Sequence, residues 1–319
     1  MRYNNKIFLA LIAVTFFIAC SNNKSLPQKM GERNSIYYWR TTFSIDSLEA
    51  TFIKKHKIER LYLRMFDVAL ERDFLNGTSE IVPIATTQFV SRPPTCLEIV
   101  PVVYITIEAL RTMCGKEAEY ATLIVDRLLA MATYNKCGEI REIQLDCDWT
   151  TSTRESYHLL CKFVKSELAH KGIELSATIR LHQLNEAPPP VHRGVLMLYN
   201  TGVLKDYETT NSILHIDDVE PYMKNMCYPI PLDYVYPLFG WGVKFRDNQF
   251  VSIVASDSMA IAGNEHIRYE RVAADDIIEV KALVEKNLGK PVNGNILYHL
   301  DYSQLKNYTD DEISEILSY

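Results

Sequence analysis

The chain has 319 residues, of which 47% are hydrophobic and 23% are charged, a composition typical of an ordinary globular protein. Its formal net charge of −6 gives no support to nucleic-acid binding, which calls for clustered Lys and Arg on a basic domain. The sequence contains no P-loop or GxGxxG motif for a nucleotide, and no HExxH or GxSxG motif for a zinc peptidase or a serine hydrolase. We therefore expect no nucleic-acid partner, no nucleotide and no cofactor.

The first 19 residues have the order of a secretory signal peptide. Arg2 and Lys6 supply positive charge, and residues 7–18 then form an apolar run that only Thr15 interrupts. These 12 residues are too few to cross a bilayer, because a membrane-spanning helix needs about 20 apolar residues. We therefore predict that residues 1–19 are removed.

Cys20 follows this segment, and Phe17-Ile18-Ala19-Cys20 resembles the bacterial lipobox, which usually has Leu in place of Phe17. The resemblance implies that Cys20 is acylated and becomes the new N-terminus. The alternative is an ordinary cleavage site followed by an incidental cysteine. Residues 20–34 are polar, as expected of a flexible tether before a domain of residues 35–319. We expect the lipid to hold the protein in the membrane of a bacterial cell envelope, in the outer membrane and facing the periplasm.

Short apolar runs alternate with amphipathic helical stretches over the rest of the chain. Eight runs are expected to be strands: residues 36–43, 60–68, 99–106, 142–149, 174–184, 194–200, 232–239 and 295–301. The expected helices are residues 47–57, 117–134, 152–170, 216–226 and 275–287. Asp46 is the expected N-cap of the first helix, and residues 69–97, with scattered Pro, Gly and Thr, are expected to be irregular.

The number and order of these elements favour a single-domain α/β fold, a (β/α)8 barrel of the TIM type, over an open doubly wound sheet. In residues 143–148 the odd positions are apolar, whereas Gln144, Asp146 and Asp148 are polar, and residues 175–182 show the same split. Successive strand residues point to opposite faces, so one face would meet the helices and the other would carry polar groups. An open parallel sheet would be apolar on both faces, whereas a barrel interior can be polar toward the C-terminal ends of the strands.

In such a barrel the active site lies at the C-terminal ends of the strands. Choosing the inward positions there by parity predicts a site with contributions from every strand. Its members are Arg40, Arg64, Tyr104, Thr106, Asp146, Asp148, Arg180, His182, Tyr199, Tyr236, His299 and Asp301. The alternative for His182 and for His299 is a hydrogen-bonded structural role.

Asp146 and Asp148 are the predicted catalytic residues. Two carboxylates two residues apart on one strand share a face, with Cα atoms about 6.6 to 7 Å apart. Such neighbours raise each other's pKa, so one can hold a proton near neutral pH, as acid/base work on a glycosidic bond or an amide requires. The alternative for Asp146, which lies deeper, is a structural anion paired with Arg64 or Arg180.

The segment REIQLDCDWT resembles the fourth barrel strand of chitinase-like glycoside hydrolases, family eighteen, whose pattern is DxxDxDxE. Asp146 and Asp148 match the second and third acidic positions, and the first falls on Ile143. The last position, the family's catalytic acid, falls on Thr150. Without that carboxyl, the mechanism of the family cannot run unchanged.

Aromatic residues near the expected strand ends fit a sugar ligand, because flat rings stack on the apolar faces of pyranose rings. They include Trp149 and also Trp241, which lies between Gly240 and Gly242 in an expected loop. The alternative is that most of the aromatic residues belong to the core. With the lipobox and the segment YPLFGWGVKF, the chain resembles bacterial envelope lipoproteins that carry a sugar-hydrolase-like barrel.

Three functions stay open at this point. The first is a glycosidase-type enzyme with Asp148 as acid/base and Asp146 as its charge partner. The second is a barrel that binds glycan or peptidoglycan fragments without hydrolysing them, because it has lost the acid at Thr150. The third is a scaffold lipoprotein without a ligand, and the fold alone does not choose among them.

Six cysteines follow Cys20, and they show neither a CxxC motif nor the Cys/His spacing of a zinc site, so no metal site is expected. Cys147 lies in an expected strand and Cys161 in an expected helix. These positions favour free buried thiols over disulfides.

Overall fold

The computed structural model describes residues 33–319 except residue 74, residues 225–227 and residues 255–262. The predicted signal peptide, Cys20 and most of the predicted tether lie outside the described residues. The compact unit that contains the described elements runs from Glu32 to Tyr319.

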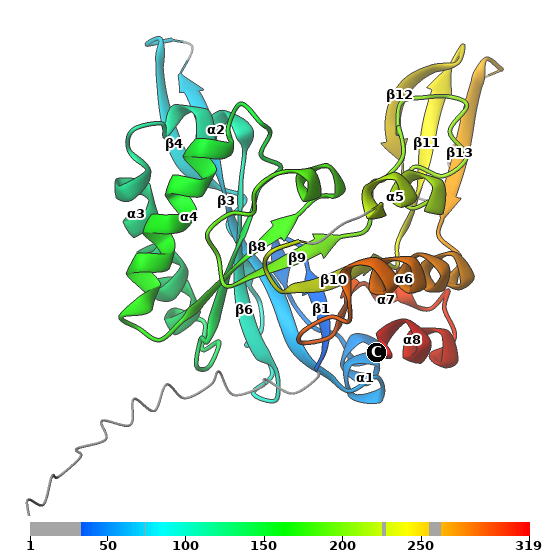
Figure 1. Ribbon diagram of the computed structural model, residues 1–319, viewed down its shortest axis with the longest axis horizontal. Coiled ribbons are helices and arrows are strands. Elements are labelled where there is room, and N and C mark those ends of the chain that lie inside the picture. The colour runs from blue at the N-terminus through cyan, green and yellow to red at the C-terminus, as the bar shows by residue number, and fades with distance from the viewer. Residues whose placement is uncertain (1–32, 74, 225–227, 255–262) are drawn as a thin grey trace, which may run out of the picture. The chain divides into compact units, whose positions relative to one another are not determined.

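Eight parallel strands form a closed (β/α)8 barrel (Figure 1). They are β1 (Asn34–Tyr38), β3 (Ile58–Asp73), β6 (Glu98–Ile105), β7 (Glu142–Asp146), β8 (Glu174–Ile179), β9 (Arg193–Met197), β10 (Leu232–Pro237) and β14 (Asn295–Tyr298). The strands pair in this order, and β1 closes the barrel by pairing with both β3 and β14. The predicted fold class is confirmed, and each of the eight predicted strands overlaps one of these.

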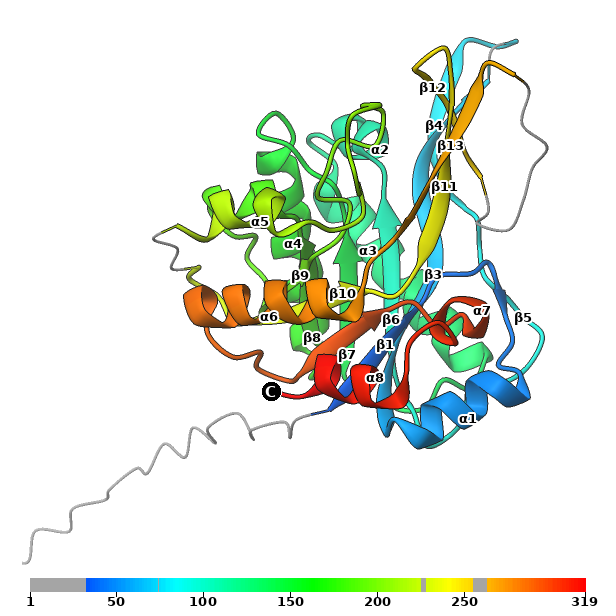
Figure 2. The same cartoon turned by 90° about the vertical axis from the view of Figure 1, so that its right-hand side faces the viewer.

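Helices cover the outside of the barrel (Figures 1 and 2). They are α1 (Ser47–Lys55), α2 (Ile107–Thr112), α3 (Glu117–Tyr134), α4 (Arg154–Ala169), α5 (Ile216–Met223), α6 (Ala274–Leu288), α7 (Tyr302–Leu305) and α8 (Asp310–Leu317). The five predicted helices are confirmed as α1, α3, α4, α5 and α6. Asp46 caps α1 as predicted, because its carboxylate accepts hydrogen bonds from the backbone N–H groups of Leu48 and Glu49. Within the described ranges, no helix combines the length and the apolar character needed to cross a membrane.

The connection between β8 and β9 contains the 3-10 helix η1 (Leu181–Asn185) in place of an α-helix. Three successive prolines, from Pro188 to Pro190, follow η1. Proline has no backbone N–H to donate, so this segment cannot continue as a helix.

The connection between β3 and β6 contains a β-hairpin where the sequence predicted an irregular segment. β3 continues to Asp73 and pairs antiparallel with β4 (Thr78–Ile84), and the short strands β2 (Thr42–Phe43) and β5 (Gln88–Phe89) pair nearby. Gly77 has a φ of 65° in the turn between β3 and β4, a left-handed conformation that glycine adopts readily. Asn-Gly between two strand-like runs is a hairpin signal, and the sequence analysis overlooked it.

A second insertion follows β10 and forms a small antiparallel sheet of β11 (Gly240–Arg246), β12 (Gln249–Val254) and β13 (Glu265–Arg271), with β11 in the middle. The prediction of a loop at Trp241 was wrong, because this residue lies in β11. Glycine on each side of it weakened the strand signal. In Figures 1 and 2, the β3–β4 hairpin and this sheet both extend beyond the end of the barrel at which the parallel strands finish.

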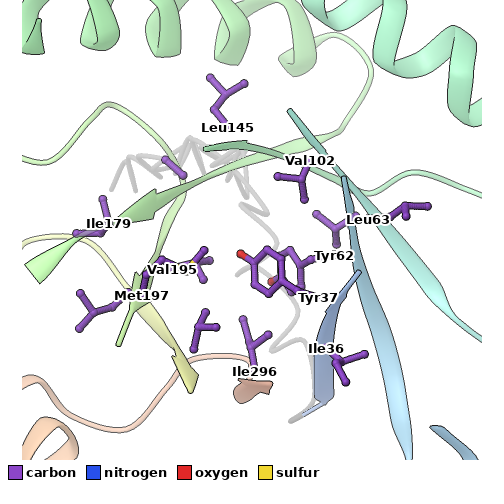
Figure 3. Packing of buried hydrophobic residues seen from close by; sticks show 14 of the residues in the cluster. Ile36, Tyr37, Tyr62, Leu63, Val102, Leu145, Ile179, Val195, Met197 and Ile296 are labelled. Carbon is purple, nitrogen blue, oxygen red and sulfur yellow. The ribbon is translucent and has the colours of Figure 1, made fainter. Parts of the chain in front are cut away.

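The interior of the barrel carries polar side chains among apolar ones, and on β7 the polar residues face inward, in agreement with the parity argument. The hydroxyl of Tyr37 donates a hydrogen bond across the barrel to Oε1 of Gln144, at 2.6 Å. Tyr37 also stacks on Tyr62 of β3, with ring centroids 4.8 Å apart. Figure 3 shows these two rings side by side in the middle of the barrel, whereas Leu145 points outward to the helices. Even-numbered residues of β7 therefore face the interior, and odd-numbered ones face the helix layer.

A buried ionic network fills the end of the barrel at which the strands begin. Arg60 binds Glu142 at 3.2 Å and Glu98 at 2.9 Å. Arg193 also pairs with Glu142, and its Nε lies 2.8 Å from Asp233. Burial alone would raise the pKa of Glu142, but Arg193 and Arg60 together lower it below its ordinary value. These charges hold one end of the barrel and lie away from the predicted site.

The five cysteines within the described ranges are free. Cys147 and Cys161 are buried, as predicted, and burial raises the pKa of both thiols. Cys227 lies outside the described residues.

Candidate functional site

Three neighbouring strands bring polar side chains to the same level near their C-terminal ends. Asp67 of β3 is the cross-strand partner of Tyr104 of β6, which is in turn the partner of Asp146 of β7. The pairing of β3 with β6 has a bulge just after Arg64, and this bulge shifts the alternation of side chains along β3. Arg64 and Asp67 consequently bind each other, with Nε and Oδ1 2.8 Å apart. Parity counting cannot foresee a bulge, so the sequence analysis missed Asp67.

Arg180 joins the two predicted catalytic carboxylates. Its Nε donates to Oδ1 of Asp148 at 2.5 Å, and its Nη2 lies 3.4 Å from Oδ1 of Asp146. Asp146 also accepts a hydrogen bond from the hydroxyl of Thr178 at 2.6 Å. Of the two partners proposed for Asp146 from the sequence, Arg180 is the one that binds it. The other, Arg64, binds Asp67.

The two carboxylates differ in their surroundings. The side chain of Asp146 is 3% exposed and that of Asp148 is 42% exposed. Burial raises the pKa of Asp146, the charge of Asp148 adds to the rise, and Arg180 and Thr178 oppose it. Burial opposes the charge of Arg180, but Asp146 and Asp148 outweigh it and raise the pKa of the guanidinium well above its ordinary value. The guanidinium of Arg180 therefore forms ion pairs with both Asp146 and Asp148.

An open cavity of about 290 Å³ lies beside this ion pair. Its lining includes Asp148 and Arg180, and the rest of the lining comes from η1, from the end of β9 and the segment after it, and from α5. The other lining residues are Leu181, His182, Met197, Tyr199, Asn200, Thr201 and Tyr222. Burial raises the pKa of Tyr199 to about 12, against the opposing charge of Arg180. Tyr199 therefore stays neutral and can donate a hydrogen bond.

Aromatic rings continue from the cavity to the small antiparallel sheet. Tyr298, at the end of β14, contacts Tyr199 with ring centroids 4.6 Å apart and Phe239 with centroids 5.8 Å apart. Phe239 in turn contacts Trp241 of β11 at 5.2 Å. Trp39 contacts Tyr298 from the end of β1 at 6.2 Å. These five rings, which we call the aromatic row, run from the cavity across the barrel mouth.

Several predicted site residues lie together at this end of the barrel. Arg180, His182 and Tyr199 line the cavity with Asp148. Tyr104 is close enough to Asp148 and Asp146 for their charges to raise its pKa, in addition to the larger effect of burial.

Trp149, Tyr236 and His299 do not lie where the sequence analysis placed them. Trp149 is fully buried and stacks on Tyr157 of α4, with ring centroids 6.1 Å apart. Tyr236 has the same parity as Tyr234, whose hydroxyl donates to the carbonyl of Gly289 at the end of α6, so both face the helix layer. A ligand in the barrel mouth cannot reach Trp149 or Tyr236.

Val235 lies between Tyr234 and Tyr236 on β10 and therefore faces the interior of the barrel. Because Ile296 of β14 pairs with Val235, Ile296 and Tyr298 face the interior as well. The prediction of His299 as an inward residue was therefore off by one position. Burial lowers the pKa of the His299 imidazole. Tyr298, which the sequence analysis missed, occupies the expected place.

Arg40 and Asp301 have structural partners elsewhere. Arg40 binds Glu49 of α1 at 2.7 Å and lies over the ring of Tyr38. Asp301 caps α7 by accepting a hydrogen bond from the backbone N–H of Ser303 at 3.0 Å. Both lie beyond the last residue of their strand, where period-two alternation no longer sets the direction of a side chain.

The described part of the chain contains no group of three or more His, Cys, Asp or Glu residues arranged to hold a metal ion.

The fold and the position of the site define a TIM-type barrel with a polar mouth. No protein-family model and no curated protein matches the chain. Solved structures do match it. The crystal structure of a chitinase from Chromobacterium violaceum has a TM-score of 0.57 and 12% sequence identity, and the match covers 90% of this chain and 98% of that one.

Two further crystal structures show the same likeness. The spore cortex-lytic enzyme SleL of Bacillus cereus has a TM-score of 0.56 and 17% identity, with 91% of this chain and 75% of that chain covered. The GH18 chitinase ChiB of Flavobacterium johnsoniae has a TM-score of 0.51 and 12% identity, with 90% and 93% covered. At these identities the comparisons show a shared chitinase-like barrel fold.

Proposed function

We propose that this protein is a lipid-anchored protein of the bacterial cell envelope whose barrel binds a glycan at its mouth without hydrolysing it. The observation that carries the proposal is the arrangement of Arg180 between Asp148 and Asp146. Asp148 accepts a charge-assisted hydrogen bond from the guanidinium of Arg180, which engages its Oδ1. It is free to accept hydrogen bonds from a ligand.

The loop after β7 supports the same conclusion. Thr150 occupies the position at which the chitinase-like glycoside hydrolases have their catalytic acid. Its hydroxyl lies 3.0 Å from the hydroxyl of Ser152 in the turn before α4. A threonine hydroxyl does not supply the proton that a leaving sugar needs. The neighbouring acidic residue, Glu186, is occupied by Arg154 and by the hydroxyl of Thr151.

The barrel mouth has the groups that a sugar ligand requires. Phe239, Trp241 and Tyr298 of the aromatic row offer flat apolar surfaces. The cavity beside them offers Asp148, Asn200 and Thr201 as hydrogen-bonding partners. Ligand sites of this kind combine mostly apolar walls with a few placed polar groups. The names of the similar structures, two chitinases and a spore cortex-lytic enzyme, support a polysaccharide as the ligand.

A glycosidase is the second candidate function, and one observation favours it. The pKa of Asp146 is raised by burial, and a carboxyl that keeps its proton to higher pH is suited to general acid catalysis. The near-complete burial of Asp146 speaks against it, because a catalytic acid must reach the glycosidic oxygen.

Titration calorimetry on the purified full chain in detergent tests the proposal. The ligands are chitin oligosaccharides, chitosan oligosaccharides and peptidoglycan fragments, and the release of reducing ends is followed in parallel. We expect saturable binding with no release of reducing ends, and binding about tenfold weaker in Asp148→Asn, because a hydrogen bond to a charged group is lost.

Asp217→Asn is the matched control, since Asp217 is 82% exposed on α5 and should not affect binding. Release of reducing ends that disappears in Asp148→Asn would make the protein a glycosidase. If none of these ligands binds, the remaining function is that of a scaffold lipoprotein without a ligand.

A further inference from the structure

The charges at the barrel mouth do not balance. Asp148 and Asp146 share the single guanidinium of Arg180, at 2.5 and 3.4 Å. Arg64, the other cation at this level, is taken up by Asp67. The cavity therefore has an acidic excess next to its most exposed carboxylate, that of Asp148.

A third carboxylate adds to this excess. The hydroxyl of Thr201, which lines the cavity, donates to Oδ2 of Asp218 at 3.2 Å. Among the described residues that line the cavity, Arg180 is the only Lys or Arg. An anionic ligand would thus meet Asp148 in the cavity wall and Asp218 behind Thr201, and would find Arg180 already engaged.

Asp148 is placed to receive a cation. Oδ1 accepts the hydrogen bond from Arg180, and the described part of the chain provides no further hydrogen bond to this carboxylate. Its side chain is 42% exposed at the cavity wall. Tyr222 lines the same cavity, and tyrosine rings attract cations through their negative faces. The ring of Tyr199, in contrast, already has the guanidinium of Arg180 at 5.5 Å from its centroid.

We propose that this cavity selects glycans that carry a free, protonated amino group, such as β-1,4-linked glucosamine, over N-acetylated and over acidic glycans. The proposal rests on the glycan-binding function proposed above. An ammonium group donates a charge-assisted hydrogen bond to Asp148, and acetylation removes that charge. A sugar carboxylate is repelled by the same group, so the acidic excess selects by repulsion as well as by attraction.

The test compares three hexasaccharides of equal length: glucosamine, N-acetylglucosamine and galacturonic acid. Their affinities for the full chain in detergent are measured by titration calorimetry at pH 6 and low ionic strength, where the sugar amine is protonated. We expect the glucosamine hexamer to bind about tenfold more tightly than the N-acetylated hexamer. The galacturonic acid hexamer should not bind measurably. The preference for glucosamine should shrink as salt is added, because salt screens exposed charges.

Two variants assign the preference to the acidic residues. Asp148→Asn should weaken binding of the glucosamine hexamer about tenfold more than that of the N-acetylated hexamer, and Asp218→Asn should do the same to a smaller extent. Asp217→Asn, on the same helix as Asp218 but facing solvent, is the control and should change neither affinity. A preference that survives in Asp148→Asn would overturn the role given to this carboxylate.

The outcomes separate this inference from the proposed function. If the N-acetylated or the acidic hexamer binds as tightly as the glucosamine hexamer, the charge selection is wrong and glycan binding stands. If none of the three binds and peptidoglycan fragments also fail to bind, the proposed function itself is wrong, and the inference falls with it.

Discussion

Arg180 and Asp148 are 32 residues apart in the sequence, yet the guanidinium of one donates to the carboxylate of the other at 2.5 Å. The contact is possible because β7 and β8 are adjacent and parallel, so the residues that follow both strands emerge at the same end of the barrel. The charge of the mouth and the position of Asp148 both depend on this one arginine.

Arg180→Gln should lower the free energy of unfolding by about 3 to 5 kcal/mol, because it leaves the buried Asp146 without its counter-charge. Urea unfolding at pH 7 measures the effect. Arg141→Gln is the control, since Arg141 pairs with the 75% exposed Glu139 and should change the free energy by no more than about 0.5 kcal/mol. Similar losses in both variants would show that Asp146 does not need Arg180.

Leu145→Asp should destabilise the protein by several kcal/mol, because it buries an unpaired charge between β7 and the helix layer. Asp148→Asn, three residues away at the exposed mouth, should cost less than about 1 kcal/mol. The two variants are compared by thermal and urea unfolding. Equal losses would contradict the assignment of odd positions to the helix layer and of Asp148 to the mouth.

Glu142→Gln should destabilise the protein in a pH-dependent manner. The folded-state pKa of Glu142 lies below its ordinary value of 4.5, so its carboxylate contributes stability that is present above pH 4.5 and is lost as the pH falls through the folded-state pKa. The gap in free energy of unfolding between wild type and variant should therefore be largest near pH 7, at about 3 to 5 kcal/mol, and should narrow below pH 4.5. A gap that stays constant from pH 7 to pH 3 would contradict the lowered pKa. Glu139→Gln, at the exposed surface, serves as the control.

Cys20→Ser should give an unlipidated precursor that partitions into the aqueous phase on detergent extraction of cells. Acyl chains contribute roughly 0.8 kcal/mol per buried CH₂, which holds a multiply acylated protein in the membrane. Fractionation of cells and mass spectrometry of the N-terminus provide the measurement. A variant that is still cleaved and still found with membranes would disprove lipidation at this residue.

The strands of the barrel could be predicted because each is a short apolar run. The side chains of β7 could also be assigned, since Ile143, Leu145 and Cys147 alternate with polar residues. β10 gave no such contrast: Tyr234 and Tyr236 face the helices, while Val235 has the opposite parity. Apolar and aromatic residues on both faces leave parity undetermined.

The rest of the site depends on features that a linear pattern does not contain. The bulge in β3 turns Asp67 inward, and the register of β14 against β10 puts Tyr298 in the place predicted for His299. The cation that pairs with both Asp146 and Asp148 follows another strand, so this pairing depends on tertiary structure. A pair of Asp146 with Arg180 could be predicted as one of two alternatives, but the sharing of Arg180 between Asp146 and Asp148 could not.

The closure of the barrel by β1 has a consequence for biosynthesis. Ser35 pairs with Arg60 on one side and with Ile296 on the other, so the first strand of the barrel needs a partner that is made after the other seven. Until β14 is available, the growing sheet has two open edges, which can pair with other chains and promote aggregation. Late, long-range closure of this kind is also slow. A nascent chain that stops before β14 is therefore a substrate for chaperones and proteases.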